Sequence, residues 1–304
     1  MKKTLSLITV ALSVFCLSTP ACAKETVVET GKHLKVSDEL TLYYETTGNG
    51  DIPIVFVPGW TMSSAVFERQ REHFSDSDRF RYYSYDPRGQ GRSSKTGEGY
   101  TYDQHGRDLH AFLEQLGLRD TVLVGWSFGV LKVTSYLDQF GSDSMRALVL
   151  IDGTPKTVGK DSTKDWAWVG DDNWLSNNQS YTTELLTDKR EENMKEFCEW
   201  MLEKPTSAEI KWSLDISLQT PGGIAALTNA TANSADYEAA LKAMDPEVPL
   251  LFVMGEEHWH PVVDQWIAAN KPKAKSVAMG KHLMFWQRSK EFNAELDKFL
   301  DTVE

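Results

Sequence analysis

The chain has 304 residues, of which 41% are hydrophobic and 25% are charged, and its formal net charge at pH 7 is −12. This length is sufficient for one large hydrophobic core, and α/β domains of this size are often single units with an insertion. The acidic balance, which no run of basic residues offsets, argues against nucleic acid and anionic membrane surfaces as partners.

The N-terminus has the pattern of a secretory signal. A basic start, an apolar segment at 5–17 and a small-residue ending at Ala23 predict a signal peptide over 1–23. The apolar segment is too short to span a bilayer. We therefore expect an exported protein, periplasmic or secreted, without stable membrane insertion.

The cysteines indicate a fold without intramolecular disulfides. Cys16 and Cys22 fall inside the predicted signal peptide, which leaves Cys198 alone in the mature chain. We expect Cys198 to behave as a small buried apolar residue of a helix. An exported protein without bridges fits a bacterial periplasm or medium better than a disulfide-rich eukaryotic exterior.

Six runs after the signal predict the strands of a sheet, and most are continuously apolar, as expected where helices cover both faces. The runs lie at 52–57, 80–85, 121–124, 147–151, 248–255 and 274–280, after a hairpin at 34–36 and 40–44. Helix-like stretches alternate with them at 103–118, 130–137 and 292–300. The alternation predicts an α/β fold with a mostly parallel sheet and right-handed crossovers.

Residues 156–245 break this pattern. They lack apolar strand runs, are rich in charge and tryptophan, and contain helix-like stretches at 183–202 and 207–218. We expect a helical cap inserted between two strands of the sheet. The core then has two parts, 24–155 and 246–304.

A Gly-x-Ser-x-Gly motif lies between the predicted strand at 121–124 and the predicted helix at 130–137. It reads Gly125-Trp126-Ser127-Phe128-Gly129. The glycines suit a tight strand-to-helix turn, because a side chain at either position would collide with the adjoining strand or helix. Such a turn presents Ser127 as a nucleophile and directs the Phe128 amide to where an oxyanion forms.

A second oxyanion donor is expected at the end of the strand at 52–57. There the chain reads Pro58-Gly59-Trp60. A glycine directly after a strand, near the nucleophile, favours the amide of Trp60 as the donor. The glycine-rich loop at 86–94, in contrast, is expected to be a buried scaffold.

A serine hydroxyl needs a base, which is usually histidine. Four of the seven histidines precede the sheet or lie in predicted helices, namely His33, His73, His105 and His110. His258, His260 and His282 follow strands at the carboxyl edge, where open parallel sheets bind ligands. His282, on the loop after the last strand, is the expected base.

Together these motifs resemble the α/β-hydrolases of the esterase, lipase and cofactor-free haloperoxidase group. The resemblance rests on 58–60, on the Asp-x-Arg-Gly-x-Gly-x-Ser turn at 86–94, on 125–129 and on His282, and it covers nearly all of the mature chain. It implies an α/β-hydrolase fold, a serine nucleophile and no cofactor. Pro58 stands where the family usually has histidine, which matters little for a backbone donor.

The acid of the expected triad departs from the family pattern. The resemblance implies an aspartate three residues after Gly255, but His258 occupies that position. Asp152, at the end of the strand at 147–151, is the first choice because the superfamily also places the acid there. Glu256 and Glu257 remain alternatives, and Asp152 is as well suited to cap the turn that follows it.

The expected pocket is apolar, with Met62, Trp126 and Met284 as substrate contacts beside the cap tryptophans. An apolar cleft under a cap favours small or medium acyl, aryl or lactone substrates, so we predict a serine esterase. No metal is expected, because His258 and His260 lack a clear third ligand. Two other functions stay open: perhydrolase or haloperoxidase activity, and ligand binding without catalysis.

Overall fold

The computed structural model describes residues 30–161, 164–168, 173–256 and 260–303. The predicted signal peptide, 1–23, lies outside these ranges, and so do Glu257 and His258. Within them, every helix is too short or too polar to cross a bilayer.

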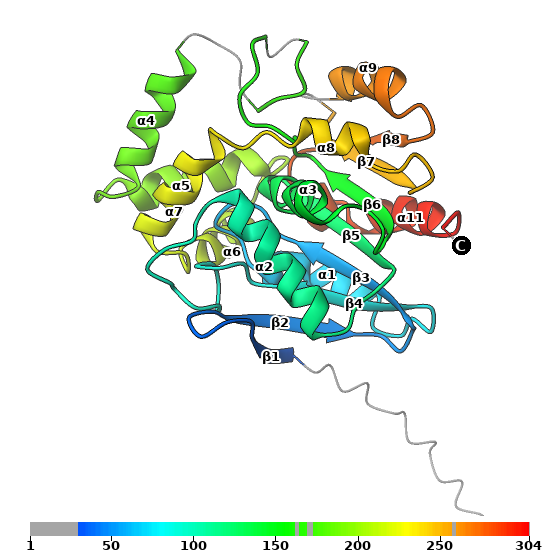
Figure 1. Ribbon diagram of the computed structural model, residues 1–304. Coiled ribbons are helices and arrows are strands. Elements are labelled where there is room, and N and C mark those ends of the chain that lie inside the picture. The colour runs from blue at the N-terminus through cyan, green and yellow to red at the C-terminus, as the bar shows by residue number, and fades with distance from the viewer. Residues whose placement is uncertain (1–29, 162–163, 169–172, 257–259, 304) are drawn as a thin grey trace, which may run out of the picture.

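One sheet of eight strands, counted over the described residues, forms the centre of the molecule (Figure 1). Its spatial order is β1-β2-β4-β3-β5-β6-β7-β8. The β1–β2 and β2–β4 pairs are antiparallel and the other pairs are parallel, which confirms the predicted sheet. The strands are β1 (Thr30–Lys35), β2 (Thr41–Thr47), β3 (Ile52–Val57), β4 (Phe80–Tyr85), β5 (Thr121–Trp126), β6 (Met145–Ile151), β7 (Leu250–Met254) and β8 (Lys275–Ala278).

Alternate residues of the central strands serve two separate hydrophobic clusters. In β3, Ile54 and Phe56 belong to one cluster, and Val55 and Val57 belong to the other. Successive side chains of a strand point to opposite faces, so a strand covered on both sides must be apolar throughout. One face is covered by α2 (Tyr102–Gln115), α3 (Phe128–Phe140), α8 (Glu238–Ala243) and α9 (His260–Asn270). The other is covered by η1 (Ser64–Phe67), α1 (Glu68–His73), α10 (Met284–Gln287) and α11 (Ser289–Leu300).

Between β6 and β7 the described chain is helical, as the sequence predicted. The helices are α4 (Trp174–Glu184), α5 (Arg190–Met201), α6 (Ser207–Ser217), α7 (Gly222–Ala232) and α8. In Figure 1, α4 to α7 gather at one side of the sheet, while α8 lies beside α3. The division into a cap at 156–245 and a two-part core stays a prediction, and α8 at its end contributes Leu241 to the core of the sheet.

The helix-like stretch at 183–202 is helical but interrupted: α4 ends at Glu184 and α5 begins at Arg190. Thr187 explains the break, because its hydroxyl donates to the Glu184 carbonyl and accepts from the Lys189 amide. A threonine that bonds its own backbone in this way offers an alternative to the helical ladder.

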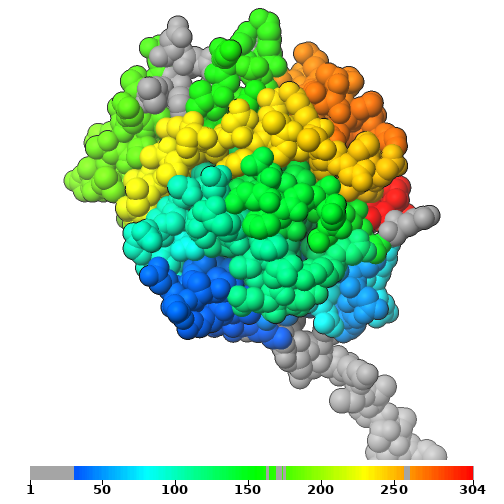
Figure 2. Space-filling model, in the orientation of Figure 1, coloured from blue at the N-terminus to red at the C-terminus, as the bar shows by residue number. Residues whose placement is uncertain are grey.

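The segment that leads from β6 toward α4 and the segment that follows α7 run side by side. Lys156 forms a β-bridge with Asp236, and the Tyr237 amide donates to the Pro155 carbonyl at 2.8 Å. The Lys156 ammonium also lies 2.7 Å from a carboxylate oxygen of Glu238. Figure 2 shows the segment that contains α7 and α8, in yellow, as a continuous band across this face of the molecule.

Glu238 is at the centre of these contacts between the two segments. Its carboxylate accepts from Lys156 and from the Trp266 indole at 2.8 Å, and Lys242 lies 2.8 Å away. Partial burial opposes ionisation, but the hydrogen bonds from Lys156, Lys242 and Trp266 outweigh it and lower the pKa of Glu238 to about 2.

The lowered pKa of Glu238 predicts that its ion pairs and hydrogen bonds lose their stabilising effect in acid. A carboxyl whose pKa falls from 4.5 to about 2 on folding stabilises the protein above pH 4.5 and loses this effect as the pH falls toward 2. Thermal unfolding should therefore show Glu238→Gln to be less stable than the wild type at pH 7, with the difference shrinking between pH 4.5 and 3. Glu247→Gln, which removes an exposed pair with Lys273, is the control and should change little at either pH. A Glu238→Gln difference that stays constant with pH contradicts the prediction.

Candidate active site

Ser127 occupies a strained turn between β5 and α3. Its backbone has φ 56° and ψ −128°, in a region that residues with a side chain rarely adopt. A Cβ on Gly129 would lie 2.1 Å from the Val57 carbonyl oxygen, and one on Gly125 would lie 2.8 Å from the Val133 side chain. Only glycine fits at both flanks, so these residues fix the tight turn on which Ser127 stands.

Asp152 and His282 form a buried pair. His282 Nδ1 lies 2.7 Å from Asp152 Oδ2, and the two side chains are 1% and 2% exposed. The other oxygen of Asp152 accepts from the Gly255 amide at 2.7 Å. The carboxylate therefore joins the end of β6 to the end of β7 and to the loop after β8, instead of capping its own turn.

The imidazole of His282 is held on several sides. The Trp126 indole donates to the His282 carbonyl at 2.8 Å, and the two rings lie 5.2 Å apart. The rings of Trp200 and Trp168 lie 4.9 Å and 5.7 Å from it. Its Nε2 is buried and has no hydrogen-bond partner in the described part of the chain. With Nδ1 bound to a carboxylate, Nε2 is the nitrogen that can accept a proton.

The two amides expected to bind an oxyanion flank Ser127. Phe128 is the first residue of α3, so its N–H is among those that the helix cannot satisfy. Gly59 packs against Ser127 so closely that a Cβ on it would lie 3.2 Å from Ser127 Oγ. The amide of Trp60 follows directly. The geometry thus brings both predicted donor residues to the serine.

A cavity of about 250 Å³ opens at Ser127, between the end of the sheet and helices α4, α5 and α7. Its walls are mainly aromatic, with a few polar side chains. It is lined by Trp60, Ser127, Phe128, Trp168, Asn178, Tyr181, Phe197, Trp200 and Asn229. A ligand that reaches the serine is therefore surrounded by rings from both parts of the chain.

Some sequence-based predictions for the pocket differ from this lining. Met62, Trp126 and Met284 are at most 1% exposed and pack in the hydrophobic core beneath the site. In the sequence they follow strand ends or turns, as pocket-lining residues often do. Their side chains instead pack in the hydrophobic cluster on the face of the sheet that α10 and α11 cover. Sequence reasoning missed Asn178, Tyr181, Phe197 and Asn229, because helix positions in a cap show which face is inward only after the cap is folded.

The other residues considered for the acid of the triad do not contact His282 in the described part of the chain. Glu256 is exposed and lies 3.3 Å from Arg288. Glu257 and His258 lie outside the described residues. Groups of three or more side chains that could hold a metal ion do not occur over the described ranges.

Two scaffold predictions are confirmed. Asp86 is fully buried and accepts from the Ser64 amide at 2.8 Å and the Arg92 amide at 2.7 Å, so the loop at 86–94 is structural. Cys198 is fully buried, and this burial raises the pKa of its thiol to about 11, which leaves it protonated at neutral pH.

A family model described as alpha/beta hydrolase fold matches residues 52–288. The chain belongs to this family. The match spans β3 to α10 and includes the Ser127 turn, Asp152 and His282.

Relatives of this alpha/beta hydrolase have more than one activity in their names. A putative non-heme chloroperoxidase from Synechocystis sp. is 38% identical over 119 residues, which are 39% of this chain and 42% of that protein. A bifunctional esterase/perhydrolase from Acinetobacter calcoaceticus is 31% identical over 129 residues, or 42% of this chain and 46% of that protein. The matches span less than half the length of these two relatives. The esterase EaEST from Exiguobacterium antarcticum has a TM-score of 0.78 over 90% of this chain and 100% of that one, and at 20% identity it supports the fold alone.

The Asp152–His282 pair leads to a mutational prediction. Asp152→Asn should lower kcat of hydrolysis by about 10³- to 10⁴-fold, because an amide favours the wrong tautomer of the imidazole and does not stabilise its cation. Steady-state kinetics measure this. Glu256→Gln is the control and should keep wild-type turnover. Near-full turnover of Asp152→Asn, with a large loss in Glu257→Gln, would move the acid to Glu257.

Proposed function

We propose that this protein is a serine hydrolase that cleaves a small or medium ester through an acyl-enzyme. The observation that most supports the proposal is the buried hydrogen bond of 2.7 Å between Asp152 and His282 at the sheet edge where Ser127 also stands. An ordered carboxylate–imidazole pair beside a strained serine is the arrangement that activates a hydroxyl.

In the proposed reaction, Ser127 Oγ attacks the ester carbonyl carbon and its proton passes to His282 Nε2. The amides of Trp60 and Phe128 stabilise the negative charge on the carbonyl oxygen. The bond to the alcohol then breaks, and His282 returns the proton to the leaving oxygen. Water attacks the acyl-enzyme in the same way and releases the acid. Asp152 stabilises the imidazolium in both halves.

The cavity sets the expected size and chemistry of the substrate. About 250 Å³ accommodates a short acyl chain with a compact alcohol or aryl group, but not a polymer. The rings of Trp60, Phe197 and Trp200 favour apolar or aromatic groups. A net charge of −12 disfavours strongly anionic substrates.

A second candidate activity is perhydrolysis, which the bifunctional esterase/perhydrolase among the relatives favours. Hydrogen peroxide would replace water in the second half of the reaction. Its oxygen attacks the acyl carbon, the bond to Ser127 Oγ breaks, and a peracid leaves. The same residues serve both reactions, so the competition between water and peroxide decides the product.

We also propose that the protein is exported, on the basis of the pattern at 1–23. Expression in a bacterial host with cell fractionation and mass spectrometry should give a chain that begins at Lys24 in the periplasm or medium. An uncleaved chain in the cytoplasm contradicts the proposal.

A chromogenic ester series tests the hydrolase. Turnover should be highest for short acyl chains and fall steeply for chains that exceed the cavity, and Ser127→Ala should lose at least about 10³-fold in kcat at every length. Peracid formation from acetate and hydrogen peroxide, measured on the same enzyme, shows which nucleophile is preferred. A protein that hydrolyses no ester and whose Ser127 is not labelled by a phosphonate is a ligand-binding member of the fold instead.

A further inference from the structure

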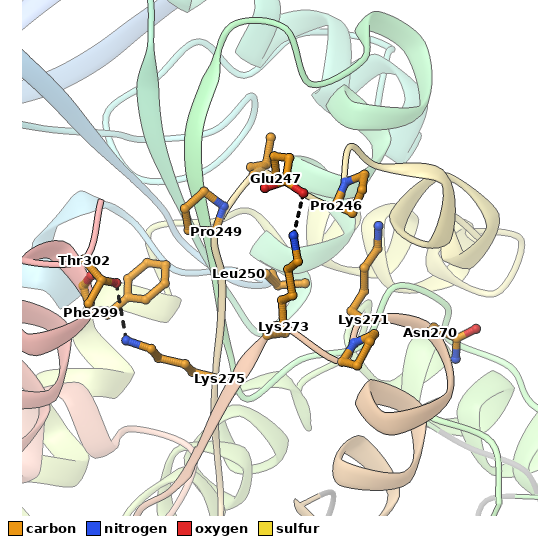
Figure 3. A pocket seen from close by; sticks show the side chains of 13 residues that line it. Pro246, Glu247, Pro249, Leu250, Asn270, Lys271, Lys273, Lys275, Phe299 and Thr302 are labelled. Atoms are coloured by element: carbon orange, nitrogen blue, oxygen red, sulfur yellow. Dashed lines mark hydrogen bonds and ion pairs between the residues drawn. The ribbon is translucent and has the colours of Figure 1, made fainter. Parts of the chain in front are cut away.

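Two buried lysines stand out among the described residues, and they have different surroundings. Lys271 lines a second hollow of about 290 Å³, by the amino-terminal ends of β7 and β8 (Figure 3). Its ammonium donates to the Met244 carbonyl, and the neighbouring Lys273 and Lys275 bind Glu247 and Thr302. The hollow thus lies at the sheet edge opposite to Ser127, with its lysines already engaged.

Lys132 lies instead beside the candidate active site. It is in α3, five residues after Ser127, and is 1% exposed. Its Nζ donates to the Pro58 carbonyl at 2.7 Å, to Gln90 Oε1 at 3.0 Å and to the Gly59 carbonyl at 3.2 Å. Three acceptors match the three N–H groups of an ammonium ion. Among the described residues, no carboxylate forms an ion pair with it.

Burying the charged ammonium of Lys132 is energetically unfavourable. Burial lowers the pKa of Lys132 well below 10.5, because the ammonium has been removed from water. The three oxygens oppose this effect, since each binds the charged form. A buried cation without a carboxylate partner is rare, and this one lies against the loop that precedes Trp60.

Gln90 completes the contact with this loop. Its amide nitrogen donates to the Gly59 carbonyl at 2.8 Å and to the Met62 carbonyl at 2.6 Å, while its oxygen accepts from Lys132. The Gly59 carbonyl therefore has two donors, one of them charged. On its other side the loop binds the cap, because the Thr220 hydroxyl donates to the Thr61 carbonyl at 2.9 Å.

The direction of the Gly59 carbonyl determines that of the next amide. The described peptide bonds are trans, and in a trans peptide the carbonyl and the following N–H point in opposite directions. Because the Gly59 carbonyl faces Lys132 and Gln90, the Trp60 N–H faces away from them. Gly59 itself packs against Ser127, so the Trp60 N–H belongs to the part of the loop that contacts the serine.

We propose that Lys132 is a positioning residue for the oxyanion hole: its ammonium holds the Gly59–Trp60 peptide so that the Trp60 amide is aimed at the developing oxyanion. The inference rests on the proposed serine hydrolase and adds a residue to it. A cation on the carbonyl side also polarises the peptide, which makes its N–H a stronger donor. Such an effect acts on the transition state more than on the bound ester, so it changes kcat rather than KM.

Lys132→Met, which keeps the length of the side chain without its charge, tests the proposal. We expect kcat for a short ester to fall about 10- to 100-fold with KM within about threefold of the wild type. A boronic acid that forms a tetrahedral adduct on Ser127 should lose affinity by a similar factor. Lys271→Met is the matched control: it removes the other buried lysine and should leave both quantities unchanged.

The outcomes separate the proposal from its alternatives. Equal losses in Lys132→Met and Lys271→Met, a higher KM at unchanged kcat, or unchanged boronate affinity would each overturn it. If Lys132→Met does not fold, Gln90→Met replaces it. We expect this variant to lose about threefold to tenfold in kcat with KM unchanged, because one donor of the oxyanion hole is weakened. An unchanged kcat in Gln90→Met overturns the proposal. An unlabelled, inactive wild type would refute the serine hydrolase itself, whatever Lys132 does.

Discussion

The buried hydrogen bond between Asp152 and His282 is the interaction on which the site depends. Asp152 also accepts from the Gly255 amide, so one carboxylate connects the ends of β6 and β7 with the loop after β8. Removing a carboxylate and an imidazole from water is unfavourable unless they bind each other in good geometry. The pair is therefore stable only when the strand ends are in register, which links the chemistry of the site to the packing of the sheet.

Helix α7 and the loop after β3 meet at the same place. The indole of Trp60 donates to the Ala225 carbonyl at 2.9 Å in α7, while the backbone of the loop before it binds Lys132 and Gln90 in the core. The residue expected to stabilise the oxyanion thus also forms a wall of the cavity and an anchor for the cap. Rings from both parts enclose the serine, which lowers the local dielectric and strengthens the polar contacts that remain.

Much of the core could be predicted because its signals are local. Runs such as 147–151 are apolar throughout because β6 is covered on both faces, and the glycines around Ser127 form a short sequence motif, although the contact that excludes a side chain at Gly129 comes from Val57 in β3. The cap was less predictable. Its helices are marginal in isolation and owe their ends to tertiary contacts and to side chains such as Thr187, so the break between α4 and α5 was missed.

The sequence by itself determined the α/β fold, the tight turn at Ser127 and His282 as the histidine after the last strand, since each follows from a pattern of residues along the chain. Only the tertiary structure decided that His282 binds Asp152 rather than Glu256, that Met62 and Met284 pack in the core, and that Lys132 holds the loop before Trp60. These are contacts between segments far apart in the chain, where several residues have suitable chemistry. The folded sheet selects among them because only some can be buried with all their hydrogen bonds made.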